Sequence, residues 1–152
     1  MIDVTDIRTL LPHRYPMLLV DRVTELVAGS RITAIKAVTC NEPWYARLTN
    51  DDDHGYPEML LVESWMQAAG LLILLAPGRS TTPGEVMLAG RLSGVEFHRQ
   101  VLPGDVLRHD VRMVKDLAHT VMVEGECTVD GAPVLTVSRA LLAFRPEGAV
   151  QW

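Results

Sequence analysis

The sequence predicts an α+β fold in which a mostly antiparallel sheet of five to seven strands wraps around one long helix. Residues 57–76 are apolar nearly all round beyond the first turn, which is typical of a helix that is buried on most faces. Strand-like segments joined by short turns dominate the rest of the chain. No internal repeat, low-complexity tract or linker interrupts the 152 residues, so we expect a single domain over residues 1–152.

The elements before the long helix are a short helix and a hairpin. The short helix is expected over residues 4–10, because Pro12 and Pro16 follow it and stop it. The hairpin strands, 17–27 and 31–40, are rich in apolar residues and are separated by a Gly-Ser turn. Alternation in the second strand places four side chains on one face: Ile32, Ala34, Lys36 and Val38.

A polar loop, residues 41–56, leads from the hairpin to the long helix. Pro57 suits the first helical turn, and Pro77 followed by Gly78 ends the helix. We therefore expect this central helix over about residues 57–76.

The second half of the chain is typical of a strand meander, with turns at residues 103–104 and 130–131. The expected strands cover residues 85–92, 95–100, 105–117, 119–130 and 132–144. Residues 146–152 are expected to form a C-terminal tail.

Composition excludes several classes of protein. The apolar run of the central helix, residues 68–76, is far shorter than the ~20 residues that a membrane span requires. Charged residues near the N-terminus interrupt the place of a signal peptide, so we expect a cytoplasmic protein. The net charge of −5 argues against nucleic acid as the main partner. Cys40 and Cys127 lack metal-ligand spacing and are expected to be reduced thiols. No nucleotide, flavin or metal motif is present, so neither a cofactor nor a metal is expected.

Glu63 is the most informative residue, because it is a carboxylate in the middle of the apolar helix. Burying an ionised carboxylate without a partner costs several kcal/mol. Glu63 is therefore either a functional group or a structural one that is paired with an Arg or hydrogen-bonded by Gln67, four residues later.

Four sequence blocks in register resemble the FabZ-type 3-hydroxyacyl-[acyl-carrier-protein] dehydratases. They are LPHRYPMLLVDRV at 11–23, NEPWY at 41–45, ESWMQAAG at 63–70 and FHRQVLPGD at 97–105. The resemblance implies a hot-dog fold and a dimer whose two active sites lie between protomers. It also implies that a His removes the proton next to the thioester carbonyl, and that Glu63 acts as the general acid that protonates the departing hydroxyl.

The catalytic His of that family has no counterpart here. Where the family has Gly-His-Phe-Pro, this chain has ARLT at 46–49, and its loop is about one residue longer, so Leu48 or Thr49 falls at the position of the base. His54 is the only histidine in this loop and is the candidate replacement base. The alternative is a solvated loop His beside the acidic residues 51–53.

Further site residues are expected on the acyl tunnel and at its mouth. Gln67, Tyr56 and Trp65 are candidate substrate-binding residues, although the aromatic side chains could equally be ordinary core packing. An acidic acyl carrier protein needs a local basic patch, for which Arg99 is the preferred residue. The other candidates for this patch are Arg79, Arg91 and His98.

Three functions are compatible with these residues. The first is a dehydratase acting on 3-hydroxyacyl thioesters of an acyl carrier protein in fatty-acid or polyketide biosynthesis, as a homodimer. The second is a catalytically incomplete subunit of a heterodimer whose related hot-dog partner supplies the His. The third is a hot-dog thioesterase or isomerase that uses Glu63 alone.

Overall fold

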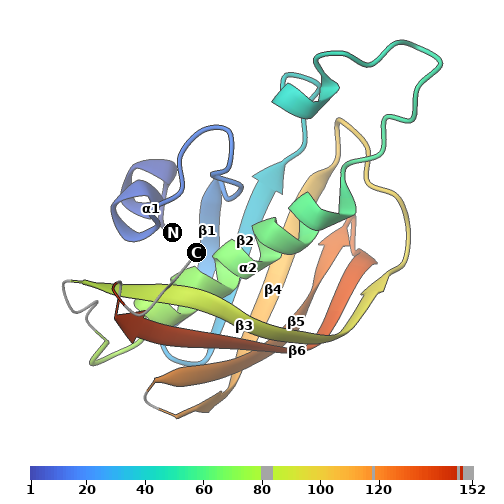
Figure 1. Cartoon of the computed structure of the whole chain (residues 1–152). Coiled ribbons are helices and arrows are strands. Elements are labelled where there is room, and N and C mark those ends of the chain that lie inside the picture. The colour runs from blue at the N-terminus through green and yellow to red at the C-terminus, as the bar shows by residue number, and fades with distance from the viewer. Residues whose placement is uncertain (80–83, 118, 147, 149–152) are drawn as a thin grey trace.

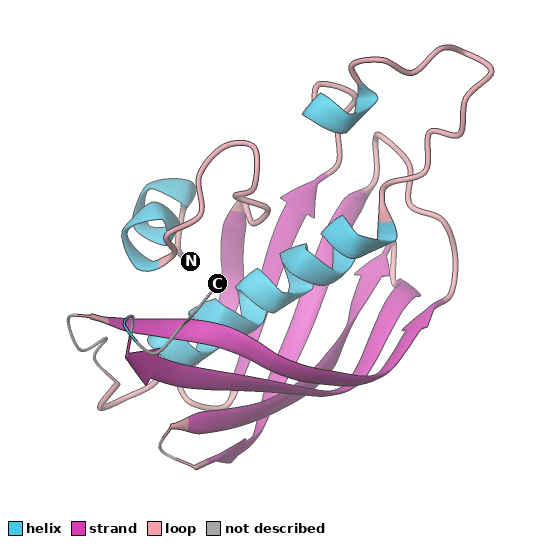
Figure 2. Ribbon diagram, in the orientation of Figure 1, coloured by secondary structure: helices cyan, strands magenta, loops and turns pink. Residues whose placement is uncertain are grey.

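The computed structural model describes residues 1–79, 84–117, 119–146 and 148. Within these residues the chain forms one six-stranded antiparallel sheet that curves around helix α2 (Glu58–Leu74), as Figures 1 and 2 show. The strand order is β1-β2-β4-β5-β6-β3. The strands are β1 (Arg22–Val27), β2 (Arg31–Ala37), β3 (Glu85–Phe97), β4 (Val106–Asp116), β5 (Thr120–Val129) and β6 (Ala132–Pro146). The predicted α+β fold class, with its sheet wrapped around one long helix, is confirmed.

Helix α2 is the centre of the hydrophobic core. Its first residue follows Pro57, and the chain turns away after Leu74 through Gly78, which has a positive φ of 73°. The core contains apolar side chains from every strand of the sheet except β3, whose apolar residues pack against it only partly buried. Trp65, Ala68 and Ala69 are fully buried on α2. The helix can be apolar nearly all round because the curved sheet covers most of its faces.

The first strand is shorter than its composition suggests, because it begins at Arg22 rather than at residue 17. The backbone of residues 17–19 is bonded to side chains of α2 instead of to a neighbouring strand. In β2 the alternation is as expected, and the predicted face, which includes Lys36, is buried.

The two strands expected at 85–92 and 95–100 are a single strand, β3, which pairs with β6 along its whole length. Gly94 has a φ of 59°, and a Cβ added there would meet the Ser138 side chain at 2.5 Å. The strand therefore continues through this glycine, and the register irregularity of β3 lies between Ala89 and Arg91. β3 is the last strand of the sheet, and its other edge has no strand neighbour in the part of the chain that the structure describes.

The N-terminal helix, α1 (Val4–Leu10), is capped by the Asp3 side chain, which accepts hydrogen bonds from the N–H groups of Thr5 and Asp6. At the other end, β6 extends to Pro146, and most of the expected tail lies outside the described residues. None of the described helices is long and apolar enough to cross a membrane.

Candidate active site

Glu63 lies in the second turn of α2 and lines a small cavity of about 110 Å³. Its side chain is 35% exposed, so the carboxylate is accessible although the helix around it is buried. The other lining residues, mostly apolar, are Leu11, His13, Met66, Gln67, Met87, Ala89 and Leu142. The site therefore combines one carboxylate, one imidazole and one amide with an apolar wall.

Gln67 fixes one oxygen of Glu63. Its Nε2 donates to Glu63 Oε1 at 2.9 Å and to the Met17 carbonyl at 2.7 Å, while its Oε1 accepts from the Leu19 N–H at 2.8 Å. Both amide hydrogens and the amide oxygen are thus used. The reverse orientation would place the amide oxygen against the Met17 carbonyl and the amide N–H groups against the Leu19 N–H, so Gln67 has one satisfied orientation.

His13 lies beside Glu63, with its Nε2 3.4 Å from Glu63 Oε1. The His13 side chain is 34% exposed, and its Nδ1 is buried without a hydrogen-bond partner among the described residues. These two residues are fifty positions apart in the chain, and no local sequence pattern connects them. The one signal that could have indicated the pair is that each residue lies in a block of the same family resemblance.

The remaining predicted site residues lie elsewhere. His54 is half-buried in the loop before α2 and does not line the Glu63 cavity. Trp65 is fully buried in the core, where it packs against neighbouring side chains. Tyr56 and Arg99 line a second cavity of about 450 Å³ at the start of α2, and the Arg99 guanidinium donates to the Val129 carbonyl at 3.4 Å.

A buried polar cluster anchors the loop that replaces the family's His segment. Lys36 Nζ lies 3.0 Å from Glu42 Oε1 and 5.8 Å from the centre of the Tyr56 ring, which packs edge-on against Trp44. Burial and the nearby Glu42 carboxylate raise the pKa of Tyr45 to about 12, and the same two causes raise the pKa of Tyr56. Both phenols therefore stay neutral at physiological pH, and the loop is held against the core.

Two acidic residues of this loop stabilise its turns by accepting hydrogen bonds. Asp52 accepts hydrogen bonds from the N–H and hydroxyl groups of Thr49, which lower the Asp52 pKa. Asp53 accepts from the Gly55 N–H and from the Gln100 amide. Among the described residues, no three side chains of the kinds that bind metals are grouped so that they could hold an ion.

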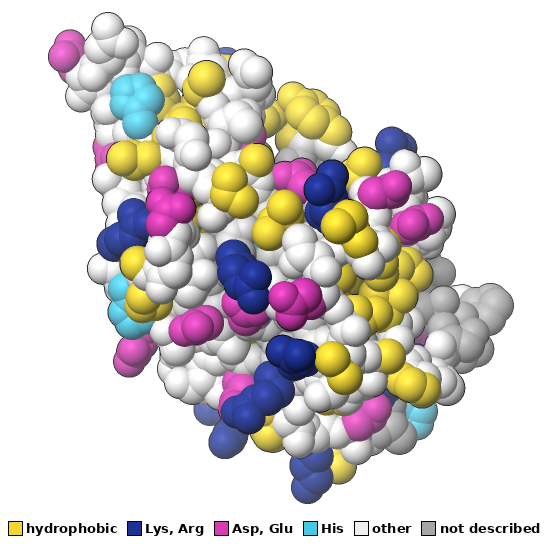
Figure 3. Space-filling view, turned by 180° about the vertical axis from the view of Figure 1, so that it is seen from behind, with side chains coloured by type: hydrophobic (Ala, Val, Ile, Leu, Met, Phe, Trp, Pro, Cys, Tyr) yellow, Lys and Arg dark blue, Asp and Glu magenta, His cyan; other side chains and the backbone are white. Residues whose placement is uncertain are grey.

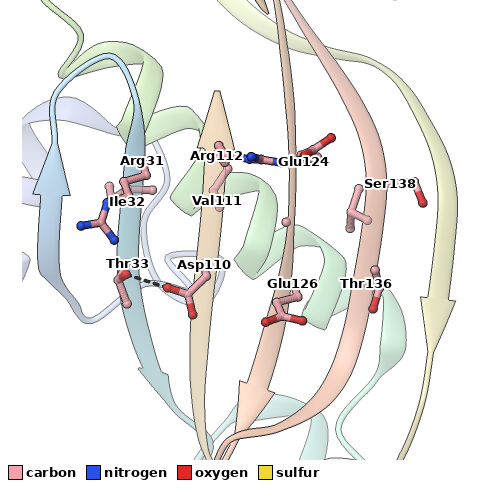
Figure 4. A pocket seen from close by; sticks show the side chains of 12 residues that line it. Arg31, Ile32, Thr33, Asp110, Val111, Arg112, Glu124, Glu126, Thr136 and Ser138 are labelled. Carbon is pink, nitrogen blue, oxygen red and sulfur yellow. Dashed lines mark hydrogen bonds and ion pairs between the residues drawn. The ribbon is translucent and has the colours of Figure 1, made fainter. Parts of the chain in front are cut away.

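Another hollow, of about 570 Å³, lies on the face of the sheet that points away from α2 (Figure 4). Two of its carboxylates are paired: Asp110 accepts from Thr33 at 2.7 Å, and Glu124 pairs with Arg112. Acidic and basic side chains intermingle on the side of the molecule seen in Figure 3. Most of the residues that line this hollow are polar or charged, unlike the mostly apolar residues around Glu63.

Residues 11–138 match the model of the family described as FabA-like domain. The chain belongs to this family. FabZ 3-hydroxyacyl-[acyl-carrier-protein] dehydratases are similar over most of the length of both chains. The one from Streptococcus thermophilus is 43% identical (86% of this chain, 89% of the relative), and the one from Granulibacter bethesdensis is 36% identical (99% and 88%).

Solved structures show the same fold for this FabA-like chain. The dehydratase heterocomplex ApeI:P from Xenorhabdus doucetiae superposes with a TM-score of 0.72 at 19% identity, covering 93% of this chain and 92% of that one. A mutant thioesterase, PA1618 from Pseudomonas aeruginosa, superposes with a TM-score of 0.67 at 14% identity, covering 95% and 94%. The hot-dog fold that the sequence resemblance implied is thereby confirmed.

Proposed function

We propose that this chain is a dehydratase of 3-hydroxyacyl thioesters carried by an acyl carrier protein, with Glu63 as the general acid. One observation carries the proposal. The chain is related to FabZ dehydratases, and its Glu63 lines a mostly apolar cavity. Glu63 Oε1 accepts a hydrogen bond from Gln67 and faces His13, whereas Oε2 has no hydrogen-bond partner within the described residues. Oε2 is then the oxygen that carries a proton to the substrate.

The proposed reaction removes one water from the acyl chain. A base takes the proton from C2, and the electron pair of that C–H bond moves toward the thioester carbonyl to give an enolate-like species. Collapse of this species forms the C2–C3 double bond and breaks the C3–O bond. Glu63 gives its proton to the departing hydroxyl, which leaves as water. The proton on the base returns to Glu63 through solvent and completes the cycle.

The base is proposed to come from a second subunit. The Glu63 cavity is bordered by Met87 and Ala89 of β3, whose outer edge has no neighbouring strand in the described part of the sheet. An exposed strand edge is a template for pairing with another chain. In a homodimer the candidate base is His54 of the second copy, whereas in a heterodimer it is a His of a related subunit. The likeness to a dehydratase heterocomplex makes the heterodimer the second assembly to test.

Arg99 is proposed as a docking residue for the acidic carrier protein, because it lines the cavity at the start of α2 together with His98. Arg99→Glu should then raise KM for carrier-bound substrate and leave KM for a small thioester analogue unchanged. Arg31→Glu, on the far face of the sheet, is the matched control. Equal KM values for Arg99→Glu and wild type would remove Arg99 from the docking surface.

Mass spectrometry of a 3-hydroxyacyl carrier protein incubated with the purified chain tests the activity. Loss of one water that disappears in Glu63→Gln and persists in Glu25→Gln, an exposed carboxylate of β1, supports the dehydratase. Release of the free acid would instead assign thioester hydrolysis to Glu63. An intact substrate with the chain alone, followed by water loss after addition of a related hot-dog subunit, would assign the heterodimer.

Mixing two inactive variants tests the shared site of a homodimer. Glu63→Gln and His54→Ala would each be inactive, but a hybrid dimer would contain one intact site. Random exchange of subunits should therefore restore about a quarter of the wild-type sites. No recovery after verified subunit exchange would exclude His54 as the base of a neighbouring subunit.

A further inference from the structure

A buried Ser64–His109 pair lies behind Glu63 and takes no part in the proposed chemistry. Ser64 follows Glu63 on α2, His109 lies on β4, and neither side chain is exposed. Ser64 Oγ is 2.7 Å from His109 Nε2 and donates to the Leu19 carbonyl at 2.6 Å. The register partners of His109 on the two neighbouring strands, Ala34 and Cys127, are also buried.

Counting protons defines the direction of these bonds. A serine hydroxyl has one hydrogen, and the Leu19 carbonyl can only accept, so that hydrogen points at Leu19. His109 Nε2 must then be the protonated nitrogen and donate to Ser64 Oγ. Burial, with a contribution from the Lys36 charge, lowers the pKa of His109 to about 3, so the ring is a neutral donor at physiological pH.

The pair is connected to the Glu63 carboxylate through the backbone of residue 19. Ser64 holds the Leu19 carbonyl, and the Leu19 N–H donates to Gln67 Oε1 at 2.8 Å. Gln67 in turn donates to Glu63 Oε1 at 2.9 Å. Every group along this path other than Glu63 is buried, so the bonds that join His109, Ser64, Leu19 and Gln67 are protected from competing water.

We propose that Ser64 and His109 are positioning residues. By holding Leu19 against α2, they keep Gln67, and through it the Glu63 carboxylate, in the single orientation that leaves Oε2 free for the substrate. The effect on turnover rests on the proposed dehydratase function, whereas the effect on the Leu19 backbone does not depend on it.

Amide hydrogen exchange tests whether Ser64 holds the Leu19 backbone in place, and it requires no enzyme turnover. Ser64→Ala should speed exchange of the Leu19 amide by about tenfold or more, because its carbonyl loses the bond that holds it against α2. The Val121 amide, in the far part of the sheet, is the internal control and should not change. An unchanged Leu19 amide in folded Ser64→Ala would overturn the proposal.

Steady-state kinetics of five variants, measured in the assembly that is active as a dehydratase, separate an effect on positioning from an effect on stability. Ser64→Ala should lower kcat by about tenfold with KM within about twofold of wild type, and should have no further effect in a Gln67→Ala background. His109→Gln keeps a donor toward Ser64 and should retain more activity than His109→Leu.

The double variant Ser64→Ala/His109→Leu gives the decisive comparison. It removes the buried imidazole donor that Ser64→Ala leaves unpaired, so it should be more stable than Ser64→Ala. Its kcat should nevertheless stay low, because Leu19 is still released. If kcat instead recovers together with stability, the pair is structural only and the positioning role is wrong.

Discussion

Gln67 Nε2 lies 2.9 Å from Glu63 Oε1, across one turn of α2, while the same side chain bonds the backbone of Met17 and Leu19. One amide therefore couples the candidate acid to the segment that precedes β1. This coupling explains why residues 17–19 are not part of a strand. It also gives the carboxylate a fixed direction although its own side chain is partly exposed.

Gln67→Leu should impair both stability and turnover. The substitution leaves the buried Leu19 N–H without an acceptor, which costs about 1–3 kcal/mol. It also frees the Glu63 carboxylate to rotate, so we expect kcat to fall by about tenfold or more. Urea unfolding and steady-state kinetics check the two effects, and a variant with normal kcat would show that Gln67 does not orient Glu63.

His13→Ala should lower kcat, because Glu63 Oε1 loses the imidazole that lies 3.4 Å away. We expect a decrease of about tenfold. The melting temperature should change little, since both side chains are about one-third exposed. His119→Ala, an exposed histidine before β5, is the control. Equal turnover by the two variants would mean that the contact with His13 has no role in the reaction.

Stability should fall as the pH is lowered from about 6.5 toward 3, because of His109. Its pKa is about 3 in the folded protein, against about 6.5 in an unfolded chain, so the unfolded state binds more protons in this window. The contribution of neutral His109 is fully present above the unfolded pKa and is lost at up to ~1.4 kcal/mol per pH unit below it. Urea unfolding at pH 7 and pH 5 should therefore show wild type losing about 2 kcal/mol more than His109→Gln. Parallel losses in the two proteins would contradict this assignment.

Lys36→Met should be strongly destabilising, because it leaves the Glu42 carboxylate buried without its partner. Removing one partner of a buried ion pair typically costs about 3–5 kcal/mol. The double variant Lys36→Met/Glu42→Gln should recover most of this loss, since no charge remains buried.

Arg108→Met is the matched control for this pair. It breaks an exposed ion pair with Asp110 and should change stability by no more than about 1 kcal/mol. Chemical denaturation of the variants tests the comparison, and similar losses for Lys36→Met and Arg108→Met would show that burial of the Lys36 pair is not what makes it important.

Local patterns in the sequence predicted the parts of this structure that depend on local physics. The long apolar segment identified α2, and alternation identified the inner face of β2. The four-residue spacing of Glu63 and Gln67 offered their hydrogen bond as one alternative, and the structure contains it. The break expected between residues 92 and 95 was wrong, because β3 continues through Gly94, where φ is positive. Apolar composition also extended β1 too far, since side chains of α2 take the backbone groups of residues 17–19.

The contacts that complete the site are long-range, and sequence spacing contains no record of them. His13 meets Glu63 because the segment before β1 is hydrogen-bonded to α2, and Ser64 meets His109 because β4 packs against α2. The sequence offered His54 as the candidate base. In the proposed mechanism the base acts from a second subunit, so a single chain does not decide between His54 and the His of a related partner.

Deuterium incorporation at C2 of the substrate tests the central claim, that Glu63 is the acid and another group is the base. Glu63→Gln is incubated in D₂O with a 3-hydroxyacyl carrier protein, in the assembly that is active for wild type, and the acyl chain is analysed by mass spectrometry. We expect the variant to release no water but still to exchange the C2 proton for deuterium. Loss of exchange together with loss of dehydration would make Glu63 the base, and continued dehydration at the wild-type rate would remove it from the mechanism.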